Sequence, residues 1–329
     1  MTSVLRAGSL SDTGLVQGLV LEAHGKRVTV RLLSHSGHRT EGDRRVDATL
    51  RGKIRLEGLK STNPVCCGDQ VNLHFEAETG DWTVESVVDR RNHMVRKATN
   101  LARQTHALAA NLDQVWIVNS LAEPRFSPGF ADRIALTAAA FSLPCHLIFN
   151  KSDQWSPEDL EAAQQWKDIY AAAAMEVYFC SALHGDGVGP IREAMRMQTQ
   201  LLTGYSGAGK SSLLNALFPG LNARTGAISR FSGKGTHTTT TATLYEPEVG
   251  TRLIDSPGIK EWGVLDLETY EIAYHFKEIR DLAPFCRFPN CSHTHEPSCA
   301  VLDAVREGKM ASPRYLSYLS ILNNEDQYR

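Results

Sequence analysis

Residues 204–211, Gly-Tyr-Ser-Gly-Ala-Gly-Lys-Ser, constrain the fold of this chain more than any other stretch. They fit the pattern G-x-x-x-x-G-K-[ST], whose glycines let several backbone N–H groups point at one anion. The preceding residues 200–203 predict a short buried strand, and residues 211–218 predict a helix that ends at Pro219-Gly220. A strand, a loop and a helix N-terminus in this order favour a phosphate-binding loop in a parallel α/β sheet.

The positions of this loop have expected roles. The Lys210 ammonium is expected to reach the β- and γ-phosphates of a nucleotide, and the Ser211 hydroxyl is expected to bind Mg²⁺. The candidate nucleotide-binding residues of the loop are Gly204, Tyr205, Ser206, Gly207, Ala208, Gly209, Lys210, Ser211 and Ser212. The loop does not identify the base, so other segments must supply that information.

A second motif predicts that the base is guanine. Residues 150–153, Asn-Lys-Ser-Asp, follow a predicted buried strand at 144–149 and match the N-K-x-D motif of GTPases. The Asp153 carboxylate can accept hydrogen bonds from N1 and the 2-amino group of guanine, which adenine cannot offer. Asn150 is expected to tie this loop to the base and to the phosphate loop. The Lys151 stem is expected to cover the ring, and Ser152 completes the motif.

Two further elements are expected at the same site. Ser181-Ala182, after a predicted strand at 177–180, resembles the element whose backbone N–H meets guanine O6. Residues 255–258, Asp-Ser-Pro-Gly, end another predicted strand and fit D-x-x-G. Asp255 is therefore expected in the outer coordination sphere of Mg²⁺, and the Gly258 N–H is expected to face the γ-phosphate.

Residues 232–241 are Gly-rich and then Thr-rich. We expect a mobile loop that becomes ordered on a γ-phosphate, with one threonine completing the coordination of Mg²⁺. Thr239 is the favoured threonine and Thr238 the alternative. The end of the run, from Thr240 to Tyr245, also predicts a strand.

The order of the motifs indicates a circularly permuted GTPase domain. Ordinary GTPases have the phosphate loop first, whereas here N-K-x-D and Ser-Ala precede it. Such a permutation is permissible because the termini of a domain lie at its surface, often close together. Strand–helix alternation, with proline-started helices after Ser127 and Ser156, predicts a doubly wound parallel sheet. The D-x-x-G segment then leads directly into the C-terminal region. A movement of this segment on nucleotide binding can therefore be transmitted to that region.

The first 97 residues predict a small β-barrel of the OB-fold type. About five strands are expected, from short apolar or alternating runs at 15–20, 27–32, 46–51, 53–56, 71–75 and 82–88. Bases outnumber acids here, and they are Lys26, Arg27, Arg31, Arg39, Arg44, Arg45, Arg51, Lys53, Arg55 and Lys60. They form either an RNA-binding face or a solvated surface. Residues 89–97 are expected to be a polar, basic link.

A cluster of three cysteines and two histidines lies within residues 286–299. Three thiolates and one imidazole would make a closed tetrahedral Zn²⁺ site with a structural role. Cys286, Cys291 and Cys299 are the expected ligands, with His293 as the fourth and His295 as the alternative, since spacing does not decide. One helix is expected over 267–281. Another is expected to begin at Ser312-Pro313 and to contribute Tyr315, Leu316, Leu319 and Leu322 to the core.

The length of 329 residues allows several domains. We expect an OB-like domain at 1–97, a permuted GTPase domain at 98–264 and a helical zinc-binding domain at 265–329. The net charge of −2 gives no overall signal for nucleic acid. No apolar run suits a signal peptide or a membrane span, so a cytoplasmic monomer without membrane contact is expected. Seven cysteines, an odd number, do not suggest a disulfide framework.

The ordered set of motifs over essentially the whole chain resembles the circularly permuted GTPases of the RsgA (YjeQ) family, which act in small ribosomal subunit biogenesis. The resemblance rests on the motifs at 150–153, 204–212, 237–240, 255–258 and 286–299. It implies slow hydrolysis of GTP to GDP and phosphate, stimulated by the 30S subunit. It also implies contacts of the barrel and the zinc domain with 16S rRNA, release of the factor after hydrolysis, and His293 as the zinc ligand.

The residue after D-x-x-G suggests why the unaided reaction would be slow. Many GTPases place there a glutamine that orients the attacking water, but this chain has Ile259. His237 is the best candidate within the chain to position that water, although a surface histidine without a role is an equally simple interpretation. The variant His237→Ala is expected to lose subunit-stimulated turnover and to retain its affinity for GTP.

The sequence offers three alternatives to a ribosome-linked GTPase. One is an RNA-binding module that uses GTP only as a conformational clamp. Another is a GTPase of membrane or protein traffic, which the absence of a lipidation motif disfavours. An ATPase is disfavoured by Asp153.

Overall fold

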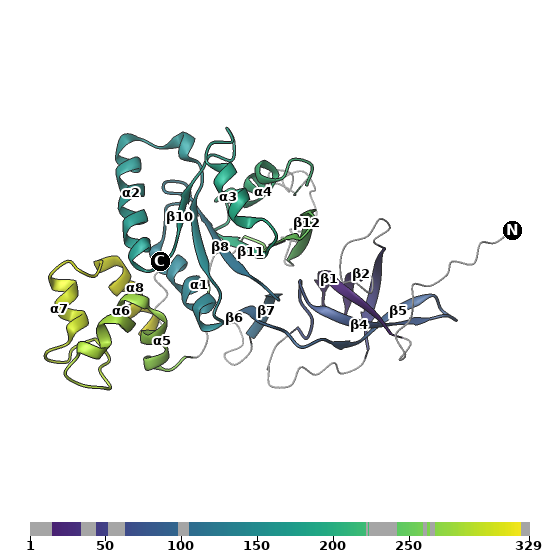
Figure 1. The fold of residues 1–329 in the computed structure, drawn as a ribbon, viewed down its shortest axis with the longest axis horizontal. Helices are drawn as coiled ribbons and strands as arrows, with labels where there is room; N and C mark the ends of the chain where they lie inside the picture. Colours follow the sequence, from purple (N-terminus) through teal and green to yellow (C-terminus); the bar gives the residue numbers. More distant parts are fainter. Residues whose placement is uncertain are drawn as a thin grey trace, which may run out of the picture.

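The computed structural model of the chain describes residues 15–33, 44–51, 63–97, 105–221, 223, 242–258, 262–263 and 267–323. Three parts follow one another along the chain: a β-barrel, an α/β layer and a group of short helices (Figure 1). The α/β layer lies between the other two, which do not meet in this view (Figure 1).

The N-terminal part is a closed five-stranded barrel. Its strands are β1 (Val16–His24), β2 (Arg27–Leu32), β3 (Arg45–Leu50), β4 (Gln70–Glu76) and β5 (Asp81–Val87). They pair in the order β1-β2-β3-β5-β4, and β4 returns to β1 and closes the barrel. Alternate residues such as Val20, Val30 and Leu73 are fully buried inside. The prediction of an OB-like barrel is confirmed, while the strand expected at 53–56 lies outside the described residues.

The predicted link at 89–97 is partly wrong. Residues His93–Lys97 form β6, which pairs with β7 (Thr105–Ala110) as a separate antiparallel hairpin. Met94 and Val95 are buried in this hairpin. A run of two apolar residues among bases is too short for periodicity to reveal a strand.

The central sheet is doubly wound, as predicted. It has the order β10-β9-β8-β11-β13-β12, and only β12 runs antiparallel to its neighbour. The strands are β8 (Gln114–Asn119), β9 (Cys145–Phe149), β10 (Val177–Phe179), β11 (Thr199–Gly204), β12 (Thr243–Glu248) and β13 (Thr251–Asp255). The carboxyl ends of the parallel strands share one edge, which is where the predicted motifs lie.

Helices cover both faces of this sheet. On one face pack α1 (Pro128–Ala140) and α2 (Pro157–Ala172), and on the other α3 (Val188–Met195) and α4 (Lys210–Leu217). Ser127 caps α1 through the Phe130 N–H, and Ser156 forms a capping box with Asp159 at α2. Both predicted helix starts are therefore confirmed.

The C-terminal part consists of short helices around their own core. They are α5 (Thr269–His275), α6 (Lys277–Leu282), a 3₁₀ turn η3 (Ala283–Phe285), α7 (Ala300–Arg306) and α8 (Ser312–Leu322). The single helix expected over 267–281 is wrong, because Phe276 has an extended backbone that separates α5 from α6. This break turns the Phe276 ring into the core, 5.7 Å from the Tyr318 ring. Leu316, expected in the core, is 54% exposed.

Candidate nucleotide site and metal-binding cluster

The phosphate loop joins β11 to α4 in a curled conformation. The Lys210 side chain is buried, and its Nζ donates to the carbonyl oxygens of Gly204 (2.9 Å) and Tyr205 (3.0 Å). Gly204 has a φ of 146°, and a Cβ there would lie 2.1 Å from the Val118 carbonyl oxygen. The first glycine of the motif is thus required by a close approach of two backbones.

Asn150 connects the predicted base-recognition segments to the phosphate loop. Its Nδ2 donates to the Ala208 carbonyl at 3.0 Å, and its Oδ1 accepts from the Ala182 N–H at 3.0 Å. The side chain is only 2% exposed. A Cβ at Gly209 would lie 2.4 Å from the Asn150 Nδ2, so glycine there makes room for this bridge. Three segments from three different loops are therefore held at one edge of the sheet.

Ser181 fixes the orientation of Asp153. The Ser181 hydroxyl donates to Asp153 Oδ1 at 2.5 Å and accepts from the His184 N–H at 3.1 Å. Asp153 itself is exposed, within the short 3₁₀ turn η1 (Ser152–Gln154). The Asp153 carboxylate is oriented by Ser181 and is exposed to solvent. It can therefore accept hydrogen bonds from a planar ligand with two adjacent N–H donors.

Lys151 has a left-handed backbone, with a φ of 68°. Its Nζ donates to the Glu123 carbonyl oxygen at 2.7 Å, so its stem is held across the loop after β8. The sequence did not reveal Glu123 as its partner, because a backbone carbonyl carries no residue-type signal.

The charges of the phosphate site are strongly desolvated. Burial raises the pKa of Asp255 to about 6, although Lys210 acts in the opposite direction. Burial lowers the pKa of Lys210, and Asp255 opposes that shift. Among the described residues, Asp255 Oδ1, Ser256 Oγ and Thr203 Oγ1 are buried without a hydrogen-bond partner. Such oxygens at the ends of β11 and β13 fit the water shell of a bound cation.

The Gly258 backbone packs on the phosphate loop. A Cβ there would lie 2.9 Å from the Ser206 Cα and 3.4 Å from the Lys210 Nζ. Within the described residues this contact brings the end of D-x-x-G to the phosphate loop. Ser211 is half-buried and Ser212 exposed at the start of α4, and Gly207 has a φ of 88°. Thr238, Thr239, His237 and Ile259 lie outside the described residues, so their expected roles stay predictions.

The sequence did not reveal one contact of the candidate phosphate loop. The Tyr205 ring of the phosphate loop packs on the Phe130 ring of α1, with 4.2 Å between centroids. An aromatic residue in the second position of the loop was the available signal, since glycines and small residues surround it.

The predicted cysteine cluster comes together before α7. Ligand atoms of Cys286, Cys291, His293 and Cys299 all lie within 4.8 Å of one another. His293 Nδ1 lies 3.5 Å from the Sγ atoms of both Cys286 and Cys299. Three thiols and one imidazole in this arrangement could hold a metal ion.

The other histidine is not a member of this cluster. His295 Nδ1 lies 2.7 Å from the Thr294 hydroxyl oxygen. The Tyr315 hydroxyl, by contrast, donates to the His293 carbonyl at 2.8 Å and supports that turn of the loop. Burial acts to raise the pKa of Glu296, but hydrogen bonds from Ser292 outweigh it and hold that pKa well below its usual range.

Comparisons with known proteins agree with this geometry. The RsgA GTPase family model matches residues 87–265. Proteins named small ribosomal subunit biogenesis GTPase RsgA are similar over 95% of this chain and 98% of their own length. Those of Porphyromonas gingivalis W83 and Christiangramia forsetii are 39% and 37% identical.

Solved structures show the same architecture. The crystal structure of YjeQ from Thermotoga maritima superposes with a TM-score of 0.70 at 30% identity, covering 94% of this chain and 98% of that one. The structure of YloQ, described as a circularly permuted GTPase, has a TM-score of 0.66 at 23% identity, covers 97% and 100% of the two chains, and supports the fold alone.

No helix in the described parts of the chain is both long and apolar enough to cross a membrane. The motif order, the geometry of the loops, the family match and the full-length relatives all lead to one assignment. The chain belongs to the RsgA GTPase family.

Proposed function

We propose that this protein hydrolyses GTP to GDP and phosphate, and that it does so as a factor in maturation of the small ribosomal subunit. The single observation that carries guanine recognition is the Asp153 carboxylate, oriented by Ser181 beside the Asn150 bridge to the phosphate loop. The relatives of known name act in small ribosomal subunit biogenesis, and they match this chain over nearly its whole length.

When a nucleotide binds, the Lys210 ammonium would exchange its present hydrogen-bond acceptors for phosphate oxygens. The Lys210 Nζ, which donates to two carbonyl oxygens of its own loop, is positioned to donate to β- and γ-phosphate oxygens instead. The loop N–H groups and the N-terminus of α4 add further donors. Ser211 and Thr239 would hold Mg²⁺, and Asp255 would bind a water of its shell. The ion would neutralise charge on the phosphate oxygens.

The proposed water-positioning group lies outside the described residues. Ile259 occupies the position of the usual glutamine and offers no hydrogen bond. His237 is the proposed positioning group for the attacking water. Since the Ile259 side chain cannot orient water, slow turnover is expected without the ribosome.

The cluster of Cys286, Cys291, His293 and Cys299 holds one structural Zn²⁺ in this proposal. Four protein ligands fill a tetrahedral shell and leave no position for substrate. The loop between η3 and α7 has little apolar core of its own, so a metal stabilises it.

The barrel and the C-terminal part are the proposed contacts with 16S rRNA in the 30S subunit, in the cytoplasm. Lys26, Arg27, Arg44 and Arg45 are exposed on the barrel and are available to phosphates. The proposed domains are an OB-like domain at 1–97, a GTPase domain at 98–264 and a zinc-binding domain at 265–329.

The decisive measurement is phosphate release by the full chain with and without purified 30S subunits. Slow release alone and much faster release with subunits support the proposal. Equal rates, together with RNA binding that depends on the bound nucleotide, would favour the alternative of an RNA-binding module that uses GTP only as a conformational clamp.

A further inference from the structure

The barrel is a continuation of the GTPase sheet and not a separately tethered unit. Strand β12, at the edge of the central sheet, pairs with β1 of the barrel through Glu22 and Thr243. The two bodies are therefore joined across their boundary by the pairing of β1 with β12.

An ion pair buried at this boundary reinforces the shared strand. Arg31 of β2 binds Glu246 of β12, with 2.7 Å from Nε to Oε2 and 3.0 Å from Nη2 to Oε1. Their side chains are 3% and 12% exposed. Glu246 also lies 3.3 Å from Arg252 of β13. The sequence places Arg31 among the basic residues of the predicted RNA-binding face, but this buried pairing makes Arg31 unavailable to RNA.

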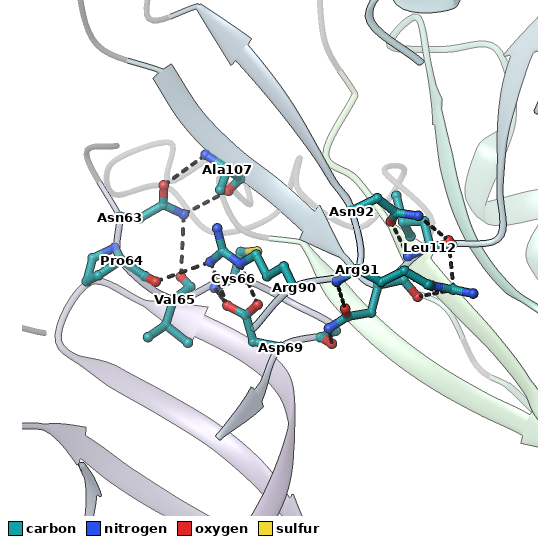
Figure 2. A network of polar contacts seen from close by, with 12 residues as sticks. Asn63, Pro64, Val65, Cys66, Asp69, Arg90, Arg91, Asn92, Ala107 and Leu112 are labelled. Carbon is teal, nitrogen blue, oxygen red and sulfur yellow. Dashed lines mark hydrogen bonds and ion pairs between the residues drawn. The ribbon is translucent and has the colours of Figure 1, made fainter. Parts of the chain in front are cut away.

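The loop before β4 contacts both sides of the same boundary. The Cys67 thiol lies 3.1 Å from the Leu21 carbonyl of the barrel and 2.9 Å from the Ala242 carbonyl just before β12. Its neighbour Asp69 binds Arg90 at 2.7 Å, with both side chains almost fully buried (Figure 2). The barrel thus cannot rotate on β12 without breaking buried polar contacts.

The boundary lies one strand away from the phosphate site. Thr243, the partner of Glu22 in the barrel, also pairs with Asp255 at the end of β13. Asp255 in turn pairs with Leu202 on β11, which leads into the phosphate loop. One row of residues therefore runs from the barrel wall to the buried carboxylate beside Lys210.

We propose that Arg31 and Glu246 are positioning residues that couple the barrel to the nucleotide site through β12 and β13. A buried ion pair has a narrow range of favourable geometries, so displacement of the barrel displaces β12. The position of β12 then affects the end of β13 and its Asp255. The ligand that uses this coupling is the RNA-bearing partner of the proposed function, on which this part of the inference rests.

Coupling is reciprocal, so the bound nucleotide must also affect the barrel, and this can be measured without a ribosome. Hydrogen exchange of the β1 and β2 amides is compared in the full chain with Mg-GDP and with a Mg-bound non-hydrolysable GTP analogue. In the wild type the two states are expected to differ by about fivefold in exchange rate. In Glu246→Gln and Arg31→Met this difference is expected to fall below about twofold.

A double variant separates coupling from stability. A single substitution removes one partner of a buried charge and is expected to destabilise the fold, whereas Arg31→Met with Glu246→Met removes both charges of the pair and is expected to recover part of the stability but not the coupling. Arg51→Gln is the matched control, because Arg51 pairs with Glu85 within the barrel and is 68% exposed. This control is expected to keep the wild-type difference.

The inference is overturned if the wild-type barrel exchanges equally with both nucleotides, or if the double variant keeps the wild-type difference. Phosphate release with 30S subunits is measured in parallel on the same proteins. If the subunits fail to stimulate the wild type while the exchange difference depends on Glu246, the proposed function fails and the coupling stands. If the subunits stimulate the wild type and the double variant keeps the exchange difference, the coupling fails and the proposed function stands.

Discussion

Asn150 lies between two loops and binds a backbone group of each, the Ala208 carbonyl at 3.0 Å and the Ala182 N–H at 3.0 Å. The first belongs to the phosphate loop and the second to the Ser-Ala element. One buried side chain therefore holds the proposed base-recognition segment and the candidate phosphate loop together.

Asn150→Ala is expected to weaken binding of GDP and GTP alike, by about 10- to 100-fold, because it leaves two buried backbone groups without partners. Isothermal titration calorimetry measures both affinities. Gln154→Ala, an exposed change in the adjoining turn, is the control and is expected to bind as the wild type does. Affinities of Asn150→Ala within twofold of the wild type would contradict the bridging role.

Asp153→Asn is expected to change the preferred base from guanine to xanthine. The amide can donate where the carboxylate accepted, and xanthine offers a carbonyl in place of the 2-amino group of guanine. Competition between GDP and XDP for a fluorescent nucleotide measures the preference. Ser181→Ala is expected to weaken GDP binding without changing that preference, because Asp153 loses the hydroxyl that orients it but keeps its carboxylate. An Asp153→Asn protein that still prefers GDP would remove Asp153 from base recognition.

Asp255 is expected to make the nucleotide-free protein less stable as the pH rises. Its pKa is raised from 3.8 to about 6 in the folded state, so its contribution to stability is present below pH 4 and is lost as pH passes through about 6. A shift of this size corresponds to about 3 kcal/mol. In magnesium-free buffer Asp255→Asn is therefore expected to unfold at a higher denaturant concentration than the wild type at pH 7.

The pH dependence of that difference is the informative readout. The advantage of Asp255→Asn is expected to shrink steadily between pH 7 and pH 4, because the wild-type carboxyl becomes protonated there. A difference that does not vary with pH would mean that burial of the charge is not its cause.

Metal retention is expected to depend on His293 and not on His295. Cys291→Ser and His293→Ala remove members of the cluster, whereas His295 turns toward Thr294. Metal content by mass spectrometry is expected to fall to background in the first two variants and to stay at one zinc per chain in His295→Ala. If His295→Ala loses zinc and His293→Ala retains it, His295 and not His293 is the metal ligand.

Much of the fold was predictable because each motif follows an apolar strand. Parallel strands end at a common edge, so Asn150, Ser181 and Asp255 had to approach the phosphate loop once the strand–helix alternation was recognised. Short apolar or alternating runs likewise predicted the five strands of the barrel. The order of the motifs, and not any one of them, identified the permutation.

What could not be predicted concerns contacts between parts of the chain. In β2 the alternation places Val28 and Val30 inside and Arg31 outside, but outside can mean either solvent or a neighbouring domain. The partner of Arg31 is 215 residues away in the sequence. Phe276 likewise continues the helical spacing of its neighbours, and no glycine or proline marks the break that turns its ring inward.

A buried ion pair fixes the C-terminal helices on the GTPase sheet. Arg314 of α8 binds Asp132 of α1, and it also binds Glu278 of α6 at 2.8 Å. The Asp132 side chain is fully buried, and the Tyr170 hydroxyl donates to it at 3.0 Å. Loss of the guanidinium would leave two carboxylates with little access to water.

Arg314→Met is accordingly expected to cost about 3–5 kcal/mol of unfolding free energy, because a buried charge loses its partner. Arg306→Met, which breaks the exposed pair with Asp303, is expected to cost less than about 1 kcal/mol. Denaturant unfolding of the full chain, followed by circular dichroism, measures both. Combining Arg314→Met with Asp132→Asn and Glu278→Gln is expected to restore most of the loss, since no buried charge then remains unpaired. If the triple variant is as unstable as Arg314→Met, the loss comes from the contacts of the Arg314 guanidinium with the Phe276 and Tyr170 rings, and the ion pair contributes little.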